Sequence, residues 1–353
     1  MAATRALLSP AADSAWVEAF TAEVAAGKRQ KGGIDVLWEK RHPEGFTKCG
    51  IAKFAAVAVL AAGIPYFHAA AAQQPGQRTF PSAEEACRTL VAALQTNDET
   101  ALLAILGPEG KEIVSSGDPA EDKENRAEFV QKYQQMQRLV TEPDGTTKLY
   151  IGAENWPTPI PLVYKGSSWY FDTPAGKQKI LYRRIGRNEL GVMMVCRELV
   201  DAEKEYYAVP HDGDSGREYA QKFLSDPNKH NGLYWEPAPG EAESPIGPLL
   251  AAAGADARNP NYQPQPFHGY FFHILMGQGA NAPGGARSYI ADGKMSGGFA
   301  FLAYPAEYRS SGVMTFIVDQ GGIVYEKDLG PNTAGIAKNM SLYERDASWQ
   351  KAD

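Results

Sequence analysis

Helical spacing that continues from Pro174 to Tyr207 constrains this chain more than any other feature. Apolar residues recur there at steps of three and four, which indicates one amphipathic helix. At about 1.5 Å per residue such a helix is roughly 50 Å long, long enough to tie two modules together. Pro174 suits its first turn and Pro210 ends it. Gly186 and Gly191 weaken the pattern and predict a kink.

The residues before this helix, 80–173, predict a first module that begins with helices. Ser82, followed three residues later by Glu85, forms a capping box ahead of an apolar-periodic run. A second, short helix is expected after Asp98, and it should stop at Gly107-Pro108. A third is expected from about Glu121 to Leu139, with Met136 and Val140 on its inner face.

The hydrophobic period then changes to that of strands between Thr146 and Phe171. Short β-prone runs alternate there with turns at Asp144-Gly145 and Lys165-Gly166, which predicts an antiparallel meander. This order, helices followed by a meander, is similar to the element order of the cone-shaped α+β fold of the nuclear-transport-factor-like group. Proteins of that shape often hold a pocket between the sheet and the helices.

A second module is expected over residues 210–335, followed by a tail at 336–353. A helix carrying Tyr219, Phe223 and Leu224 should open the module, before a Pro- and Gly-rich loop and one helical turn or two near residues 246–253. Four apolar runs then predict an antiparallel sheet covered by the long helix. These runs are 269–276, 299–304, 313–318 and 323–325. Helix, loop and meander in this order is also similar to the globular part of type IV pilins, without implying assembly.

An apolar, alanine-rich stretch near the beginning of the chain is typical of an export signal. It has a basic lead with Lys48 and Lys53, an apolar core from Phe54 to Phe67, and Ala70-Ala71-Ala72 before Gln73. The core is shorter than the roughly 20 residues that span a bilayer, so we expect cleavage after Ala72 rather than a permanent anchor.

Residues 1–47 are therefore expected to be a non-structural or mis-assigned leader, and residues 48–72 the signal peptide. The expected location of the mature protein is the periplasm or the exterior, with only a transient membrane contact. After residue 72 the chain keeps 27 basic and 36 acidic residues, a net charge of −9. This balance argues against nucleic acid as a partner, because binding to phosphate backbones needs concentrated positive charge.

Cys87 and Cys196 are the two cysteines that remain after the expected cleavage. An oxidising compartment permits a disulfide between them, which would staple the first module to the long helix. Burial of both as small hydrophobic side chains satisfies the same patterns. The sequence leaves both alternatives open.

Two clusters are candidate ligand sites. Asp212, Asp214 and Glu218 resemble part of a calcium loop, although the glycine and the final glutamate of a full loop are out of place, and an Asp-Gly turn capping a helix explains them without metal. Arg183, Arg184 and Arg187 are a candidate anion site, with a solvated face that pairs with acidic residues as the alternative.

Motifs that carry catalysis or bind cofactors are missing from the sequence. It contains no nucleophile elbow, zinc helix, Cys-x-x-Cys pair or phosphate-binding loop. The glycine-rich residues 277–285 are expected to join two strands, whereas a dinucleotide loop opens a helix. His268 and His273 are expected on opposite faces of a strand, so they should not share a metal. We therefore expect no cofactor and no metal.

Three passages of the second half resemble a known family. "FDTPAGKQKILYRRIGRNEL", "REYAQKFLSDPNKHNGLYW" and the stretch from "GYFFHILMGQG" to "FIVDQGGIVYEKDLG" look like the bacterial family catalogued as domain-of-unknown-function 2950. The likeness extends from about Phe80 to Ser348. It implies an exported bacterial protein and brings no activity and no catalytic residues with it.

Two classes of function remain. The first, which we favour, is a non-enzymatic envelope protein that binds a partner protein or a small ligand. It is motivated by the export signal, the missing motifs and an aromatic group comprising Tyr234, Trp235, Tyr270 and Phe272. The alternative is a hydrolase or isomerase that uses a carboxylate in a pocket of the first module. The candidate carboxylates are Glu84, Glu85 and Asp172.

Overall fold

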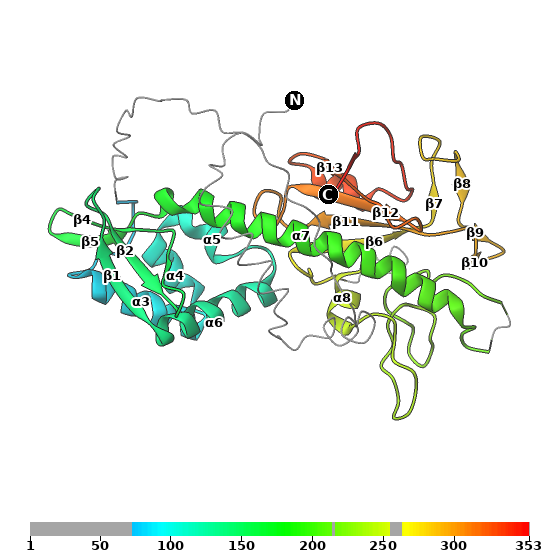
Figure 1. The fold of residues 1–353 in the computed structure, drawn as a ribbon, viewed down its shortest axis with the longest axis horizontal. Coiled ribbons are helices and arrows are strands. Elements are labelled where there is room, and N and C mark those ends of the chain that lie inside the picture. The colour runs from blue at the N-terminus through cyan, green and yellow to red at the C-terminus, as the bar shows by residue number, and fades with distance from the viewer. Residues whose placement is uncertain (1–72, 214–215, 255–262, 353) are drawn as a thin grey trace, which may run out of the picture. The chain divides into compact units, whose positions relative to one another are not determined.

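A computed structural model describes residues 73–213, 216–254 and 263–352, all within the compact unit Val59–Asp353. The described part has an α+β fold in which helices pack with antiparallel sheets, and a long helix connects two sheet regions (Figure 1). The expected leader 1–47, the signal peptide 48–72 and Asp214 lie outside the described residues.

Helices open the first module, and three of them have side-chain caps. They are α3 (Ala83–Thr96), α4 (Glu99–Leu106), the 3-10 turn η1 (Pro108–Gly110), α5 (Lys111–Val114) and α6 (Pro119–Gln135). The side chain of Ser82 accepts the backbone N–H of Glu85, as the capping box predicts. Asp98 and Asp118 cap α4 and α6 in the same way. Helices α3, α4 and α6 therefore each begin at a residue whose side chain accepts one of the free N–H groups of the first turn.

Strands β1 to β5 form the sheet of this module. They are β1 (Gln137–Thr141), β2 (Thr147–Ile151), β3 (Trp156–Pro157), β4 (Leu162–Lys165) and β5 (Ser168–Phe171). Their order is β1-β2-β4-β5, with β3 paired to β2. The expected meander is thus confirmed, but the third helix ends at Gln135 rather than Leu139. Met136 is extended, and Leu139 pairs with Leu149, so the ladder to β2 prevails over the helical spacing.

Apolar side chains fill the space between these helices and the sheet. Phe80, Ile105, Leu149, Leu162 and Phe171 are each 3 % exposed or less. The backbone of Phe80 also pairs with Trp169 of β5. This core fills the interior of the first module.

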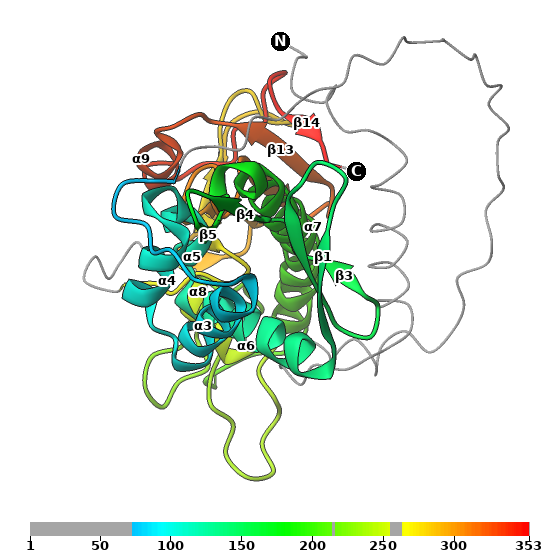
Figure 2. The same ribbon diagram turned by 90° about the vertical axis from the view of Figure 1, so that its left-hand side faces the viewer.

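Helix α7 (Thr173–Ala208) is the predicted long helix, and it continues through Gly186 and Gly191 without a break. Pro174 lies in its first turn. Val192, Cys196 and Leu199 on its buried face belong to the core of the second module. In Figure 2 α7 extends away from the viewer behind the first module.

The second module is built on a five-stranded antiparallel sheet whose order is β14-β13-β12-β11-β6. The strands are β6 (Tyr270–Leu275), β11 (Ala300–Pro305), β12 (Met314–Asp319), β13 (Val324–Asp328) and β14 (Gln350–Lys351). Helix α7 packs on β11, β12 and β13, as predicted. Two short helices, α8 (Pro248–Ala253) and α9 (Thr333–Lys338), contact β6 and β11 respectively.

The prediction of a tail at 336–353 was wrong. Strand β14 pairs with β13, and Tyr343, Trp349 and Ala352 are buried in the core of the second module. Apolar residues are few and irregularly spaced after residue 340, so no helical or strand period indicates this segment.

The helix expected around Tyr219, Phe223 and Leu224 is also absent, because the described residues between α7 and α8 contain no helix. Backbone pairing replaces it, because Leu233 and Tyr234 donate to the carbonyls of Lys222 and Phe223. Phe223 still faces the core, where it packs against Phe301 at 5.9 Å between ring centroids. The apolar spacing was therefore informative about burial and misleading about backbone conformation.

Short hairpins extend from the second sheet. They are β7 (Gly277–Gln278) with β8 (Arg287–Ser288), and β9 (Ile290–Ala291) with β10 (Lys294–Met295). The glycine-rich loop joins β7 to β8, as predicted. The amide of Gln278 donates to the carbonyls of Pro283 and Gly285, at 2.8 and 2.7 Å, and so holds the loop closed. None of the described helices is both long and apolar enough to cross a membrane.

Candidate functional site

The three arginines of the candidate anion site point to different partners. Arg184 is buried and donates to the carbonyls of Glu112 (2.6 Å) and Ile113 (2.9 Å) at the end of α5. Arg187 forms an ion pair with Glu121 at 2.7 Å. The guanidinium of Arg183 lies 5.7 Å from the ring centroid of Trp156. The three groups do not converge, and the structure uses Arg184 to join helices.

The described residues of the candidate calcium site do not converge on a common point either. Asp212 is occupied by His230, whose backbone N–H lies 3.0 Å from both carboxylate oxygens and whose Nδ1 lies 3.2 Å from Oδ1. Glu218 is half-buried. No group of three or more His, Cys, Asp or Glu side chains placed to hold a metal occurs among the described residues.

Both cysteines are free thiols in the structure, so the candidate disulfide is not formed. Cys87 lies in the core of the first module and Cys196 in that of the second. Burial raises the pKa of each thiol to about 12, so neither forms a thiolate at neutral pH. Burial as small hydrophobic residues is the alternative that the structure supports.

The side chains of the aromatic group and of His268 and His273 pack against other residues of the protein. Tyr270 and Phe272 are fully buried, while Tyr234 and Trp235 lie half-buried against the same core. His268 precedes β6 and lies against Gly191 of α7. His273 packs edge-on against Tyr304, with ring centroids 5.5 Å apart. The two histidines thus have separate neighbours.

The three carboxylates proposed for catalysis are spread over the first module. Glu84 is exposed and Glu85 half-exposed in the first turn of α3. Asp172 is buried beside the first turn of α7. They come from opposite ends of the module in sequence, and none of them lines either of the surface hollows described next.

A groove between α3 and α6 is the hollow with the richest polar lining. It has a volume of about 370 Å³. Its apolar floor consists of Leu94, Ala127 and Val130. The side chain of Ala127 is small, which leaves a gap between the two helices. Its polar lining consists of Gln95, Asn97, Lys123, Gln131 and Gln134. We call these eight residues the amide groove.

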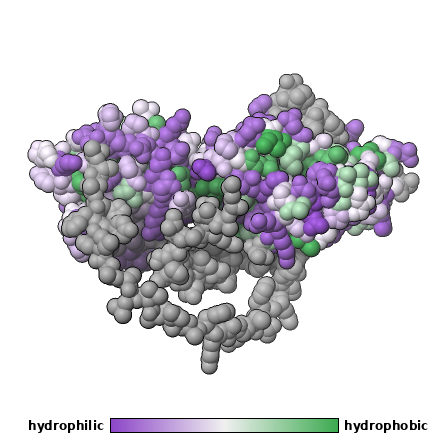
Figure 3. Space-filling model, turned by 90° about the horizontal axis from the view of Figure 1, so that it is seen from above, coloured by the Kyte–Doolittle hydropathy of each residue, from purple (hydrophilic) through white to green (hydrophobic). Residues whose placement is uncertain are grey.

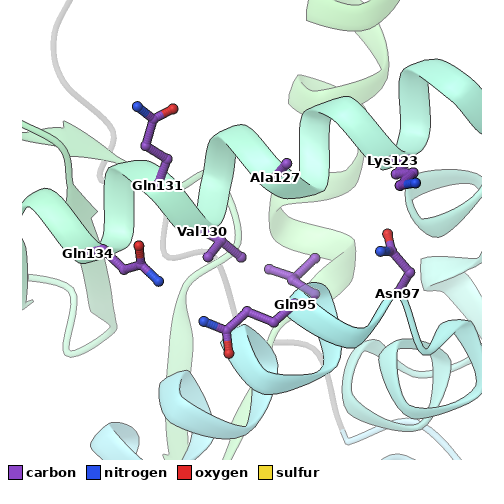
Figure 4. A pocket seen from close by; sticks show the side chains of 8 residues that line it. Gln95, Asn97, Lys123, Ala127, Val130, Gln131 and Gln134 are labelled. Atoms are coloured by element: carbon purple, nitrogen blue, oxygen red, sulfur yellow. The ribbon is translucent and has the colours of Figure 1, made fainter.

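The amide groups are distributed along the whole groove. Figure 4 shows Gln95 and Gln134 near each other at one end and Asn97 below Lys123 at the other, while Gln131 points away from the floor. Within the described part, the side-chain amides of Gln95, Gln131 and Gln134 have no hydrogen-bond partner. Carboxamides both donate and accept, so this lining matches a ligand that does the same.

Fixed backbone geometry holds the ends of the groove in place. Asn97 adopts a left-handed conformation (φ 53°) that ends α3, and its backbone N–H bonds to the carbonyls of Ala93 and Leu94. Arg126 ties α6 to this corner, because it contacts Glu99 at 2.9 Å and the carbonyl of Val114 at 2.7 Å. It also donates to Oδ1 of Asn97 at 3.4 Å. The amide N–H₂ of Asn97 remains available to a ligand.

The lining of the amide groove is polar and carries a single charged group. Lys123 is its one ionisable lining residue, and no carboxylate, histidine, cysteine or hydroxyl lines it. Carboxamides and an ammonium group both form hydrogen bonds with polar groups of a ligand. The groove can therefore hold and orient a polar molecule.

A family model described as "Protein of unknown function (DUF2950)" matches residues 77–352. The chain belongs to the DUF2950 family. No curated protein and no solved structure matches it at a significant level. The DUF2950 match covers both modules, α7 and every residue of the amide groove.

A second hollow of this DUF2950 chain lies beside the β7–β8 hairpin and has a volume of about 480 Å³. Met276, Ala286 and the exposed Leu342 contribute apolar surface to it, and Arg287 lies at its edge. Figure 3 shows hydrophobic residues gathered over the second module, whereas hydrophilic residues dominate the first. Apart from Arg287, its lining residues are apolar or neutral.

Sequence reasoning missed the amide groove because it treated Gln95 as a residue that faces water. The side chain is indeed exposed, but it faces α6 across the groove. One available signal was the amide-rich end of α6, where Gln131, Gln134 and Gln135 precede Gln137. A solvated helix face usually carries charged residues, so a run of uncharged amides is distinctive.

Proposed function

We propose that this protein is exported and acts in the bacterial envelope as a non-enzymatic binding protein. Its ligand is an extended peptide segment of a partner protein, held in the amide groove. The carrying observation is the lining, which offers four carboxamides and one ammonium group over an apolar floor. A peptide backbone presents alternating donors and acceptors, and carboxamides can satisfy both.

Export is supported by the pattern of basic, apolar and small residues that ends at Ala72. The family match begins at residue 77, shortly after that site. Gln77 is already packed in the first module, where its amide donates to the carbonyls of Ile105 (3.1 Å) and Phe171 (2.8 Å). A mature chain that starts at Gln73 would therefore keep every contact of this module.

We also propose finer relationships for the two modules. The order of helices before an antiparallel sheet supports a first module of the nuclear-transport-factor-like type, with its interior filled by side chains. Helix α7 followed by the meander β11 to β14 supports a layout like that of the globular part of type IV pilins. Both rest on element order alone, and neither implies an activity.

The test of function is binding by residues 73–353 with the groove open and blocked. Ala127→Arg places a long cation on the floor of the groove, and Ala92→Arg makes the same change at an exposed site of α3 outside it. A random peptide array and an envelope extract are probed with all three proteins. We expect Ala92→Arg to retain the peptides and partner of the wild type, and Ala127→Arg to lose them.

The side-chain amide signals of Gln95 and Gln134 provide a second readout. In nitrogen-15 NMR spectra they should shift when a selected peptide is added, whereas the amide signals of Gln221 in the second module should stay in place. Equal retention of peptide by Ala127→Arg and the wild type would refute the proposal.

A further inference from the structure

The hollow beside the β7–β8 hairpin takes no part in the proposed peptide site, which lies in the first module. We call it the hairpin hollow. Its volume of about 480 Å³ is within the range of sites that hold small molecules. Among the described residues that line it, Arg287 is the one charged side chain. In a chain whose net charge is −7, a hollow lined by a single cation is suited to an anion.

Gln278 of β7 fixes the position of Arg287. The amide nitrogen of Gln278 donates to the carbonyls of Pro283 and Gly285. Its amide oxygen accepts from Nε of Arg287 at 3.0 Å and from the hydroxyl of Tyr289 at 3.1 Å. A carboxamide has two N–H donors and two acceptor lone pairs, so its hydrogen-bonding capacity is used within the protein. Gln278 therefore supports Arg287 and does not itself bind a ligand.

The guanidinium of Arg287 is held in place but not neutralised. Its Cζ lies 5.5 Å from the ring centroid of Tyr289, and the backbone of Arg287 pairs with Gln278 across the hairpin. Within the described part Arg287 forms no ion pair, and its bond to Gln278 uses Nε and leaves out Nη1 and Nη2. A guanidinium presents parallel N–H groups that match the two oxygens of a carboxylate. Because these contacts already restrain the side chain, Arg287 loses less conformational entropy when it binds an anion.

Apolar side chains line the hairpin hollow beside this cation. Met276 precedes β7, Ala286 precedes β8, and Leu342 comes from the segment after α9. Leu342 packs closely on the hairpin because residue 277 is glycine. A Cβ at Gly277 would lie 3.1 Å from Cδ2 of Leu342 and 2.9 Å from the carbonyl oxygen of Arg287. Leu342 is nevertheless 44 % exposed, so an open apolar surface adjoins the guanidinium.

From this arrangement we infer that the hairpin hollow binds a small amphipathic carboxylate, a free molecule with a hydrocarbon chain of medium length. The carboxylate pairs with the Nη groups of Arg287. The chain lies against Met276, Ala286 and Leu342, where the flexible, polarizable side chain of Met276 adapts to its shape. The ion pair requires an anion, whereas apolar burial grows with the length of the chain. The two parts of the ligand can therefore be tested separately.

Calorimetric titration of residues 73–353 with octanoate tests the site. We expect octanoate to bind more tightly than octanol, which lacks the charge, and than acetate, which lacks the chain. Arg287→Gln should weaken octanoate about tenfold and leave octanol unchanged, because only the ion pair is lost. Arg217→Gln is the matched control, since it removes an exposed arginine elsewhere in the second module. A wild type that binds no octanoate, or binds octanol as tightly, would overturn the inference, as would an Arg287→Gln protein of unchanged affinity.

The apolar surface has a test of its own. Leu342→Asn keeps the approximate size of the side chain and should weaken octanoate and octanol alike, because the lost contact does not depend on charge. Leu249→Asn, at a residue 61 % exposed on α8, should change neither. In nitrogen-15 NMR spectra the Nε–H signal of Arg287 should shift when octanoate is added and stay in place with octanol. A signal that does not move while octanoate binds would put the ligand elsewhere and refute the site.

Discussion

Glu203 and His273 are ionisable residues that the fold takes out of water without an ion-pair partner in the described part. Glu203 is completely buried, and its Oε2 accepts the backbone N–H of Ala220 at 2.8 Å. Burial raises its pKa well above the usual value, so the folded state retains a proton that the unfolded chain has lost. This carboxyl therefore makes stability fall as pH rises above its ordinary range.

His273 acts in the opposite direction and gives a testable pH dependence. Burial, reinforced by Lys338, lowers its pKa from 6.5 to about 4. Between these values the unfolded chain binds a proton that the folded protein excludes, so stability is lost as pH falls. Between pH 7 and pH 5 this imidazole should cost the wild type about 2 kcal/mol of unfolding free energy. We predict that His273→Phe, which keeps an aromatic ring against Tyr304, does not suffer this loss.

Urea unfolding at both pH values, on variant and wild type, measures this difference. A His268 variant would be no control for this difference, because burial lowers the pKa of that imidazole in the same direction. Parallel pH profiles for His273→Phe and the wild type would show that His273 is not responsible.

Whole helices and strands were predictable wherever local signals agreed with tertiary contacts. The cap at Ser82 correctly indicated the start of α3, and the apolar runs correctly indicated β6, β11, β12 and β13. Such a cap or apolar run is compatible with few other local structures. The end of α6 and the segment around Phe223 were not predictable, since partners distant in sequence decide them. The amide groove was not predicted for a related reason, because it forms only where α3 and α6 meet.

Two glycines of α7 should respond in opposite ways to the same substitution. Gly176→Ala places its Cβ 2.6 Å from the backbone of Pro159, so we predict a loss of about 1 to 3 kcal/mol in unfolding free energy. Gly191→Ala meets only His268, at an ordinary 3.7 Å, and should gain up to about 1 kcal/mol from helix propensity. Chemical denaturation of both variants decides the matter, and an equal effect would contradict the close contact at Gly176.

At the scale of the whole described part, α7 and a few polar side chains fasten the two modules together. Glu189 accepts the backbone N–H groups of Val313 and Met314, each at 2.9 Å. Asp118 of the first module accepts the N–H of Gly269 at 3.0 Å. These contacts join elements more than 100 residues apart, which explains why the sequence indicated the helix but not the joint.

Export concerns the whole chain and has a direct test. A fusion of residues 48–80 to a reporter that is active only outside the cytoplasm should be exported and trimmed between Ala72 and Gln73, because small residues precede that bond. N-terminal sequencing of the product gives the cleavage site. Ala70→Leu combined with Ala72→Leu should block trimming, and an untrimmed wild-type fusion retained in the membrane would contradict the prediction.

The strand order β6-β11-β12-β13-β14 repeats the order in which the ribosome makes these strands. Each new strand can thus join an edge that already exists, and none has to enter between two strands made earlier. A growing sheet of this kind has an open edge at its newest strand, which is a site for wrong pairing with other chains. The last strand to be made, β14, pairs with Tyr325 and Glu326 of β13 and consists of Gln350 and Lys351 alone, so the finished sheet ends in a short edge strand that offers another chain little backbone to pair with.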